Sequence, residues 1–142
     1  MSNNNIAKIR KVEPPAIHRA KNGQERLIGG RWNMLRVTEF LLAKKTWQTM
    51  DEIARFVYGS TGEKHRDNTR KHIPSQRRYM LDKDTPIVTD YGPRGMIMRV
   101  KVYDQGKSDD QMKFETEISK ARDKKEITER RYEDLVRLFL PR

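Results

Sequence analysis

The chain contains no cysteine and no run of about 18 apolar residues, the length that a membrane-spanning helix needs. Without cysteine there is no disulfide, no thiolate zinc site and no cysteine nucleophile, as is common for proteins of reducing compartments. The first residues, 1–5, also lack the apolar stretch of a secretory signal. We therefore expect a protein that lies inside the cell and makes no contact with a membrane.

The familiar catalytic motifs are missing as well. The sequence has no P-loop, no nucleophile elbow and no glycine-rich dinucleotide loop. Asp82, Asp84 and Asp90 lack the Glu-x-Lys partner of a metal-dependent nuclease, and the histidines at positions 18, 65 and 72 do not have the spacing of metal ligands. We expect no enzymatic activity, no cofactor and no bound metal.

What the chain has in excess is positive charge. Its 142 residues carry a net charge of +11, and only 35% of them are hydrophobic, which suffices for one small core with solvated appendages. Residues 64–83 alone hold seven basic and two acidic side chains. A basic surface attracts polyanions through counterion release, although a single basic run is as often only a solvated surface.

Three regions of the chain differ in pattern. Residues 1–30 show no regular period and contain Pro14-Pro15 and Gly29-Gly30, which predicts a flexible basic arm. Residues 31–104 combine helical and strand patterns and form the expected central domain. Residues 105–142 form an expected C-terminal helical extension.

The central domain is predicted to begin with two helices. Apolar residues recur at helical spacing over residues 33–45, and residues 46–48 are too few for a helix and predict a brief strand. Thr49 and Glu52 then form a capping box, in which each side chain accepts a hydrogen bond from the backbone N–H of the other residue. This box predicts a second helix over residues 50–58, which the glycine-containing residues 59–62 end.

A third, basic helix is predicted to begin at Asp67 or Asn68, either of which can cap it, and to end near Leu81. One stripe of this helix is expected to face the core, and it consists of Thr69, Ile73, Gln76 and Met80. The side chains that point away from that stripe are Arg70, Lys71, Ser75 and Arg78. Pro74 predicts either a kink in the helix or a restart, with residues 64–72 as a separate turn.

Two antiparallel strands are predicted over residues 85–91 and 96–103, joined by a turn at residues 92–95. On the second strand one face is expected to be buried and the other solvated, because Met96, Met98, Val100 and Val102 alternate with Ile97, Arg99, Lys101 and Tyr103. Two strands alone are only marginally stable, so helices are expected beneath them.

Residues 108–140 predict an amphipathic helix or a helical hairpin, with Ser108 as its N-cap. The pattern leaves open whether Lys124-Lys125 lies within one helix or in a turn between two. It also leaves open whether these helices cover the core of the domain or form a homodimer with a second copy of the chain.

Between residues 49 and 100 several small motifs follow one another in a fixed order. They are Thr49 with Glu52, Tyr58-Gly59, His72-Ile73 followed by Arg77-Arg78, Ile87 with Thr89, and Gly92 with Gly95. In this order and spacing they resemble the winged helix-turn-helix effector domain of OmpR/PhoB-type response regulators. The resemblance implies an α+β fold with a three-helix core and a C-terminal β-hairpin wing, here standing alone without a receiver domain, as in regulators of phages or mobile elements.

The resemblance and the charge together imply a transcriptional regulator that binds double-stranded DNA sequence-specifically, in the cytoplasm of a prokaryotic or phage-infected cell and associated with its nucleoid. Contacts to phosphates are expected from Lys64, Arg66, Arg70, Lys71 and Arg78. Contacts to base edges are expected from Asn68, His72, Ser75 and Arg77. Arg94, in the turn of the hairpin, is expected to enter a minor groove.

Plainer roles compete with these expectations. His72 can be a packed or capping histidine, Trp47 a core residue, and Arg77 an ion-pair partner of Asp82 or Asp84. For the chain as a whole, the alternative is a protein-interaction module that binds RNA polymerase or the replication machinery through the winged helix or the C-terminal helices.

Overall fold

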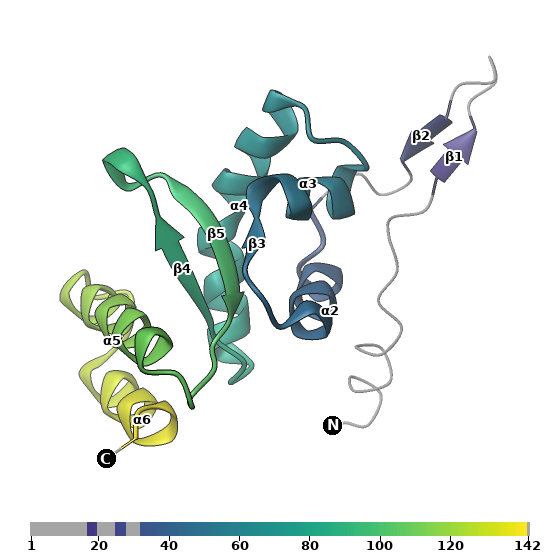
Figure 1. The fold of residues 1–142 in the computed structure, drawn as a ribbon. Helices are drawn as coiled ribbons and strands as arrows, with labels where there is room; N and C mark the ends of the chain where they lie inside the picture. The colour runs from purple at the N-terminus through teal and green to yellow at the C-terminus, as the bar shows by residue number, and fades with distance from the viewer. Residues whose placement is uncertain (1–16, 20–24, 28–31, 142) are drawn as a thin grey trace.

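The computed structural model of the protein describes residues 17–19, 25–27 and 32–141. Residues 32–141 form an α+β body with five α-helices and a three-stranded antiparallel sheet (Figure 1). Ahead of this body, β1 (Ile17–Arg19) and β2 (Glu25–Leu27) pair antiparallel, a hairpin that the sequence pattern did not predict. The other residues of the expected arm lie outside the described residues.

The first two helices lie where the sequence predicts them. α2 (Met34–Lys44) begins after Asn33, whose side chain accepts a hydrogen bond from the N–H of Arg36. α3 (Met50–Tyr58) begins with the predicted capping box, with Glu52 N to Thr49 Oγ1 at 3.2 Å and Thr49 N to Glu52 Oε1 at 2.8 Å. The brief strand predicted between them is β3 (Gln48–Thr49).

The basic helix, α4 (Glu63–Asp82), is longer than predicted, and the predicted start at Asp67 or Asn68 was wrong. Its first turn has no side-chain cap, and contacts with α3 hold it instead. His65 stacks on Tyr58 with ring centroids 4.6 Å apart, and Arg66 Nε lies 3.5 Å from Asp51 Oδ1. The helix continues through Pro74 as one element, so the predicted restart at this proline was wrong.

The buried stripe of α4 is as predicted, with 0% exposure for Thr69, Ile73, Gln76 and Met80. Gln76 is the polar member, and its carboxamide is fully satisfied by hydrogen bonds to α2 and the residues before it. Oε1 accepts from Trp32 Nε1 at 3.1 Å, and Nε2 donates to Thr38 Oγ1 at 2.8 Å and to Met34 O at 3.1 Å. These hydrogen bonds fix the position of α4 against α2.

The predicted hairpin consists of β4 (Ile87–Tyr91) and β5 (Ile97–Val102), with a 3-10 turn at Pro93–Gly95. The strand order β3-β5-β4 makes β4 an edge strand. The pairing changes register between Asp90, which lies opposite Arg99, and Tyr91, which lies opposite Ile97, so that Met98 forms a bulge.

The bulge overturns the predicted faces of β5. The alternation placed Met96 and Met98 on the face of Val100 and placed Ile97 on the opposite face. In the structure Ile97 packs against the same core as Val100, and Met96 and Met98 are exposed. The expectation of one solvated face was also wrong, because Lys101 and Tyr103 are buried. A one-residue bulge reverses the alternation of a strand, and the sequence pattern does not reveal it.

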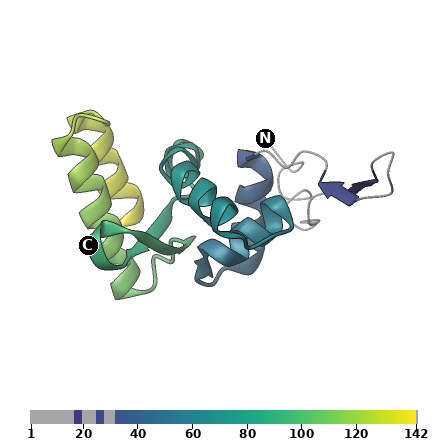
Figure 2. The same cartoon turned by 90° about the horizontal axis from the view of Figure 1, so that it is seen from above.

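The C-terminal residues form a helical hairpin of α5 (Ser108–Asp123) and α6 (Glu129–Phe139). Lys124 and Lys125 lie between the two helices, which decides that alternative in favour of a turn. Lys107 occupies the N-cap position and makes no side-chain cap, so the prediction of Ser108 as the cap was wrong. Figure 2 shows the resulting layers, with the sheet between the α5–α6 pair and α2, α3 and α4.

A second apolar core joins the sheet to α5 and α6, so these helices cover the domain. Its buried members are Val88, Tyr103, Phe114, Ile118 and Leu135, and Trp47 packs against them. The expectation that Trp47 is a core residue agrees with this contact. This second core therefore combines side chains from the predicted central domain with side chains from the predicted C-terminal extension.

One buried ion pair also fastens α5 to the sheet. Lys101 Nζ lies 2.8 Å from Asp110 Oδ2, and the two side chains are only 5% and 4% exposed. Asp110 Oδ2 additionally accepts from the N–H of Asp104 at 2.9 Å. A buried charge needs such a partner, so Lys101 and Asp110 specify how the helix docks.

Candidate functional site

A stripe of polar side chains runs along α4 on the side opposite its buried residues. The spacings of four, three, four and three residues place its members on one face of the helix. We call this face the α4 stripe, and it consists of Lys64, Asn68, Lys71, Ser75 and Arg78. All five were predicted as site residues, and the lysines and Arg78 are exposed.

The cations of the α4 stripe are available to a partner. Lys64 and Lys71 make no ion pair or hydrogen bond with any part of the chain that the structure describes. Arg78 Nη2 contacts only Ser75 Oγ, at 3.3 Å and within the stripe itself. Asp82 is an exposed acid, but it is the last residue of the helix, four residues after Arg78, and does not separate the cations of the stripe. The result is an accessible positive ridge.

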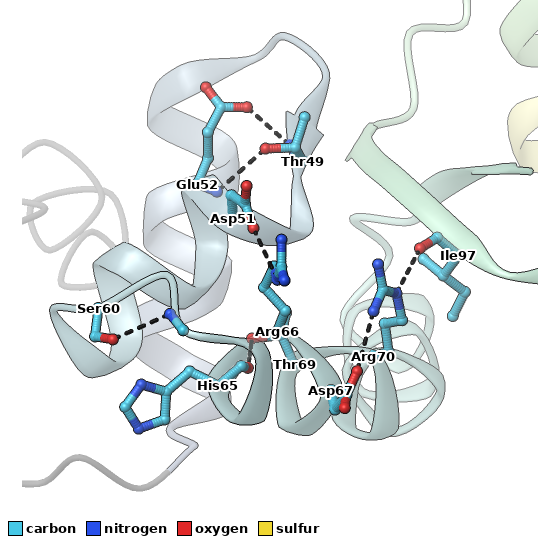
Figure 3. A network of polar contacts seen from close by, with 11 residues as sticks. Thr49, Asp51, Glu52, Ser60, His65, Arg66, Asp67, Thr69, Arg70 and Ile97 are labelled. Carbon is cyan, nitrogen blue, oxygen red and sulfur yellow. Dashed lines mark hydrogen bonds and ion pairs between the residues drawn. The ribbon is translucent and has the colours of Figure 1, made fainter.

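Arg66 and Arg70 were predicted to contact phosphates, but the structure gives both of them partners within the chain. Figure 3 shows Arg66 directed toward Asp51 of α3 and Arg70 directed toward β5. Arg70 Nε donates to the carbonyl oxygen of Ile97 at 3.2 Å, and its Nη1 lies 3.2 Å from Asp67 Oδ1. These two arginines fasten α4 to its neighbours.

Arg77 is also held within the chain. Its Nη1 donates to Tyr91 Oη at 3.1 Å and to Thr89 Oγ1 at 3.3 Å, and lies 3.6 Å from Glu117 Oε1. Arg77 is therefore in an ion pair, as the alternative predicted, but the expected partners, Asp82 and Asp84, were wrong. The acidic partner comes from α5, whose position next to β4 could not be read from the sequence.

Glu117 lies at the free edge of β4. Its Oε2 accepts from the N–H of Thr89 at 2.9 Å, while Oε1 has no hydrogen-bond partner among the described residues. Burial raises the pKa of Glu117 to about 7, against the lowering effects of Arg77, the Thr89 N–H, Lys120 and Lys113. Glu117 thus covers a strand edge that would otherwise offer an unpaired N–H to other chains.

His72 has a packing role. Its ring stacks on Trp32 with centroids 5.0 Å apart and an interplanar angle of 13°, at the side of α4 that faces α2. The position of His72 therefore agrees with the alternative of a packed histidine. The residue lies beside the α4 stripe and is not a member of it.

The turn of the hairpin presents Arg94, as predicted. Arg94 is exposed and has a left-handed φ of 61°, and Gly95 follows with a φ of 71°. Three exposed apolar residues lie next to it that the sequence pattern did not predict: Tyr91, Met96 and Met98. A signal was present, because residues 91–98 contain no acidic side chain, but the strand pattern placed the methionines on the same face as Val100 and Val102.

Comparisons with known proteins give no further guide. No family model, curated protein or solved structure matches the chain. The resemblance to OmpR/PhoB-type effector domains therefore stays a prediction. Within residues 32–141 no helix is long and apolar enough to cross a membrane, and no group of three or more His, Asp or Glu side chains is arranged to hold a metal ion.

Proposed function

We propose that the protein is a sequence-specific regulator of transcription that binds double-stranded DNA, with α4 in the major groove. The observation that carries this proposal is the α4 stripe, which has three exposed cations without an acidic partner and two short hydrogen-bonding side chains. It lies on the outer face of a helix whose opposite face is buried. The order of the elements supports a winged helix-turn-helix, with α3 and α4 as the helix pair and β4–β5 as the wing. Such a regulator acts in the cytoplasm, on the nucleoid.

The length of the α4 stripe indicates which of its members contact phosphates and which contact bases. At a rise of about 1.5 Å per residue, Lys64 and Arg78 are about 21 Å apart along the helix. The major groove is only about 12 Å wide, so the two ends reach the phosphate ridges while the middle lies over the bases. We therefore assign phosphate contacts to Lys64 and Arg78, and base contacts to Asn68, Lys71 and Ser75.

The arginines held within the chain act indirectly in this proposal. Arg70 and Arg77 bind α4 to the hairpin, and Arg66 binds it to α3. A helix fixed on both flanks presents its side chains in one geometry, which base recognition requires. Arg94 reaches the DNA beside α4 from the turn of the wing.

The salt dependence of DNA binding tests the phosphate contacts. Each phosphate that a cation neutralises contributes about 0.9 to the slope of log K against log salt concentration. We expect the double variant Lys64→Gln/Arg78→Gln to flatten this slope by about 1.8, measured by fluorescence anisotropy with a labelled duplex. A duplex from random-sequence selection provides the ligand, and loss of preference at one base position in Asn68→Ala tests base recognition.

The matched control is Lys107→Gln/Lys125→Gln. It changes the net charge by the same amount at two exposed lysines near the ends of α5. We expect its slope to equal that of the wild type. Equal flattening by both double variants would show that only the overall charge matters, and the absence of any binding to duplex DNA would refute the proposal.

A further inference from the structure

The tip of the β4–β5 hairpin is apolar and exposed. Tyr91, Met96 and Met98 are 44%, 46% and 43% exposed, and together with Met112 and Leu138 they are the large exposed hydrophobic residues of the described ranges. Three of these five therefore lie on one small hairpin tip. Exposed apolar side chains that cluster in this way, instead of lying singly on the surface, are a feature of binding sites.

The local backbone keeps these side chains outside the core. The bulge at Met98 turns the strand so that Ile97 takes the inner position, and Met96 and Met98 are left outside. Met98 lies directly over Gly92, where a Cβ atom would come within 2.7 Å of Met98 Cγ. A side chain at position 92 would displace this methionine, so the glycine preserves the apolar tip.

The tip is fixed relative to the α4 stripe. Arg70 bonds to the Ile97 carbonyl, and Arg77 bonds to the Tyr91 hydroxyl, so both strands are attached to α4 just below the turn. The hairpin therefore cannot move independently of α4.

Resting on the proposed function, we propose that the hairpin tip is a wedge that enters a minor groove, partly unstacks a base step and bends the DNA. Arg94 supplies the positive charge that the minor groove attracts, and Met96 and Met98 supply the apolar surface that inserts beside it. Proteins that deform DNA in this way combine such cations with apolar wedges and kink the duplex by about 20–90°.

The charges of the tip favour DNA over a protein as its partner. Residues 91–98 carry one basic and no acidic side chain, and the neighbouring carboxylate of Asp90 is paired with Arg99 Nε at 2.7 Å. A protein partner on Met96 and Met98 would also have to share the space next to the α4 stripe with the DNA.

A bending measurement tests the wedge separately from DNA binding. The probe is a selected duplex of about three helical turns with a fluorophore at each end, so that energy transfer between the ends reports bending while anisotropy reports binding. We expect the wild type to increase the transfer efficiency. The variant Met96→Ala/Met98→Ala should bind the duplex but return the transfer efficiency to that of free DNA.

Two comparisons sharpen this test. The control Met112→Ala removes a methionine on α5 that is 67% exposed, and it should bend DNA like the wild type. A duplex with one mismatch at the bent step unstacks more easily, so the wild type should bind it about tenfold more tightly than the intact duplex, and the double variant should not. The single variant Met96→Ser, which leaves Met98 over Gly92, repeats the test with the turn undisturbed.

Each outcome decides between the proposals. Absence of any binding overturns both the proposed function and the wedge. Binding by the wild type without bending, or equal bending by the methionine variants, overturns the wedge alone and leaves the apolar tip as a surface for a protein partner.

Discussion

Replacing Glu117 by glutamine should stabilise the protein at neutral and alkaline pH. The ionised carboxylate is buried at the edge of β4, where Oε1 has no hydrogen-bond partner among the described residues. A glutamine carboxamide keeps an oxygen that can accept from the Thr89 N–H and carries no charge. The substitution therefore removes the cost of burying an anion.

The size of the effect follows from the pKa. Burial raises the pKa of Glu117 from 4.5 to about 7, so the folded protein holds this proton more tightly than the unfolded chain does. The penalty on folding is absent well below pH 4.5, grows as the pH rises toward 7 and is constant above that. At 1.36 kcal/mol per pKa unit the full penalty is about 3 kcal/mol.

Urea unfolding of the wild type and of Glu117→Gln, followed by circular dichroism, measures this difference. We expect the variant to be more stable by about 1 kcal/mol at pH 5 and by about 3 kcal/mol at pH 8. The control Glu115→Gln changes an exposed carboxylate on the same helix and should show no such rise. A stability difference that does not change between these pH values would refute the reasoning.

Two further predictions concern buried polar groups. Gln76→Leu should cost about 2–4 kcal/mol of unfolding free energy, because it leaves the Trp32 N–H without an acceptor and removes a donor from both Thr38 Oγ1 and Met34 O, whereas the exposed Gln105→Leu should cost little. Equal losses in chemical denaturation would contradict the role of Gln76. Lys101→Met should cost about 3–5 kcal/mol by leaving Asp110 buried without its cation. Lys101→Met/Asp110→Leu should recover most of that loss in a double-mutant cycle, and a single variant as stable as the wild type would speak against the burial of the pair.

Local signals in the sequence were sufficient for several elements. The capping box of Thr49 and Glu52 fixes the start of α3 through contacts within four residues, so its boundary could be predicted. The spacing of Thr69, Ile73, Gln76 and Met80 likewise identified the buried side of α4, and with it the opposite face that carries the α4 stripe.

Features that depend on contacts between residues far apart in the sequence could not be predicted. The first turn of α4 is held by Tyr58 and Asp51, so no cap near Glu63 marks its beginning. The roles of Arg70 and Arg77 depend on where the hairpin and α5 dock, and the pattern of charges along one helix does not contain that information. Composition identified a basic surface, but only the packing separates its free cations from those that hold the fold together.

The core that the sheet shares with α5 and α6 has a practical consequence for shortened versions of the protein. A fragment that stops at residue 104 would uncover Val88 and Tyr103 and leave Lys101 without its carboxylate partner. Such a fragment would expose apolar surface that is buried in the full chain, and it would tend to aggregate. If it failed to recognise a ligand, the cause would then be a disrupted core, so experiments on α4 are best made on a chain that retains its last two helices.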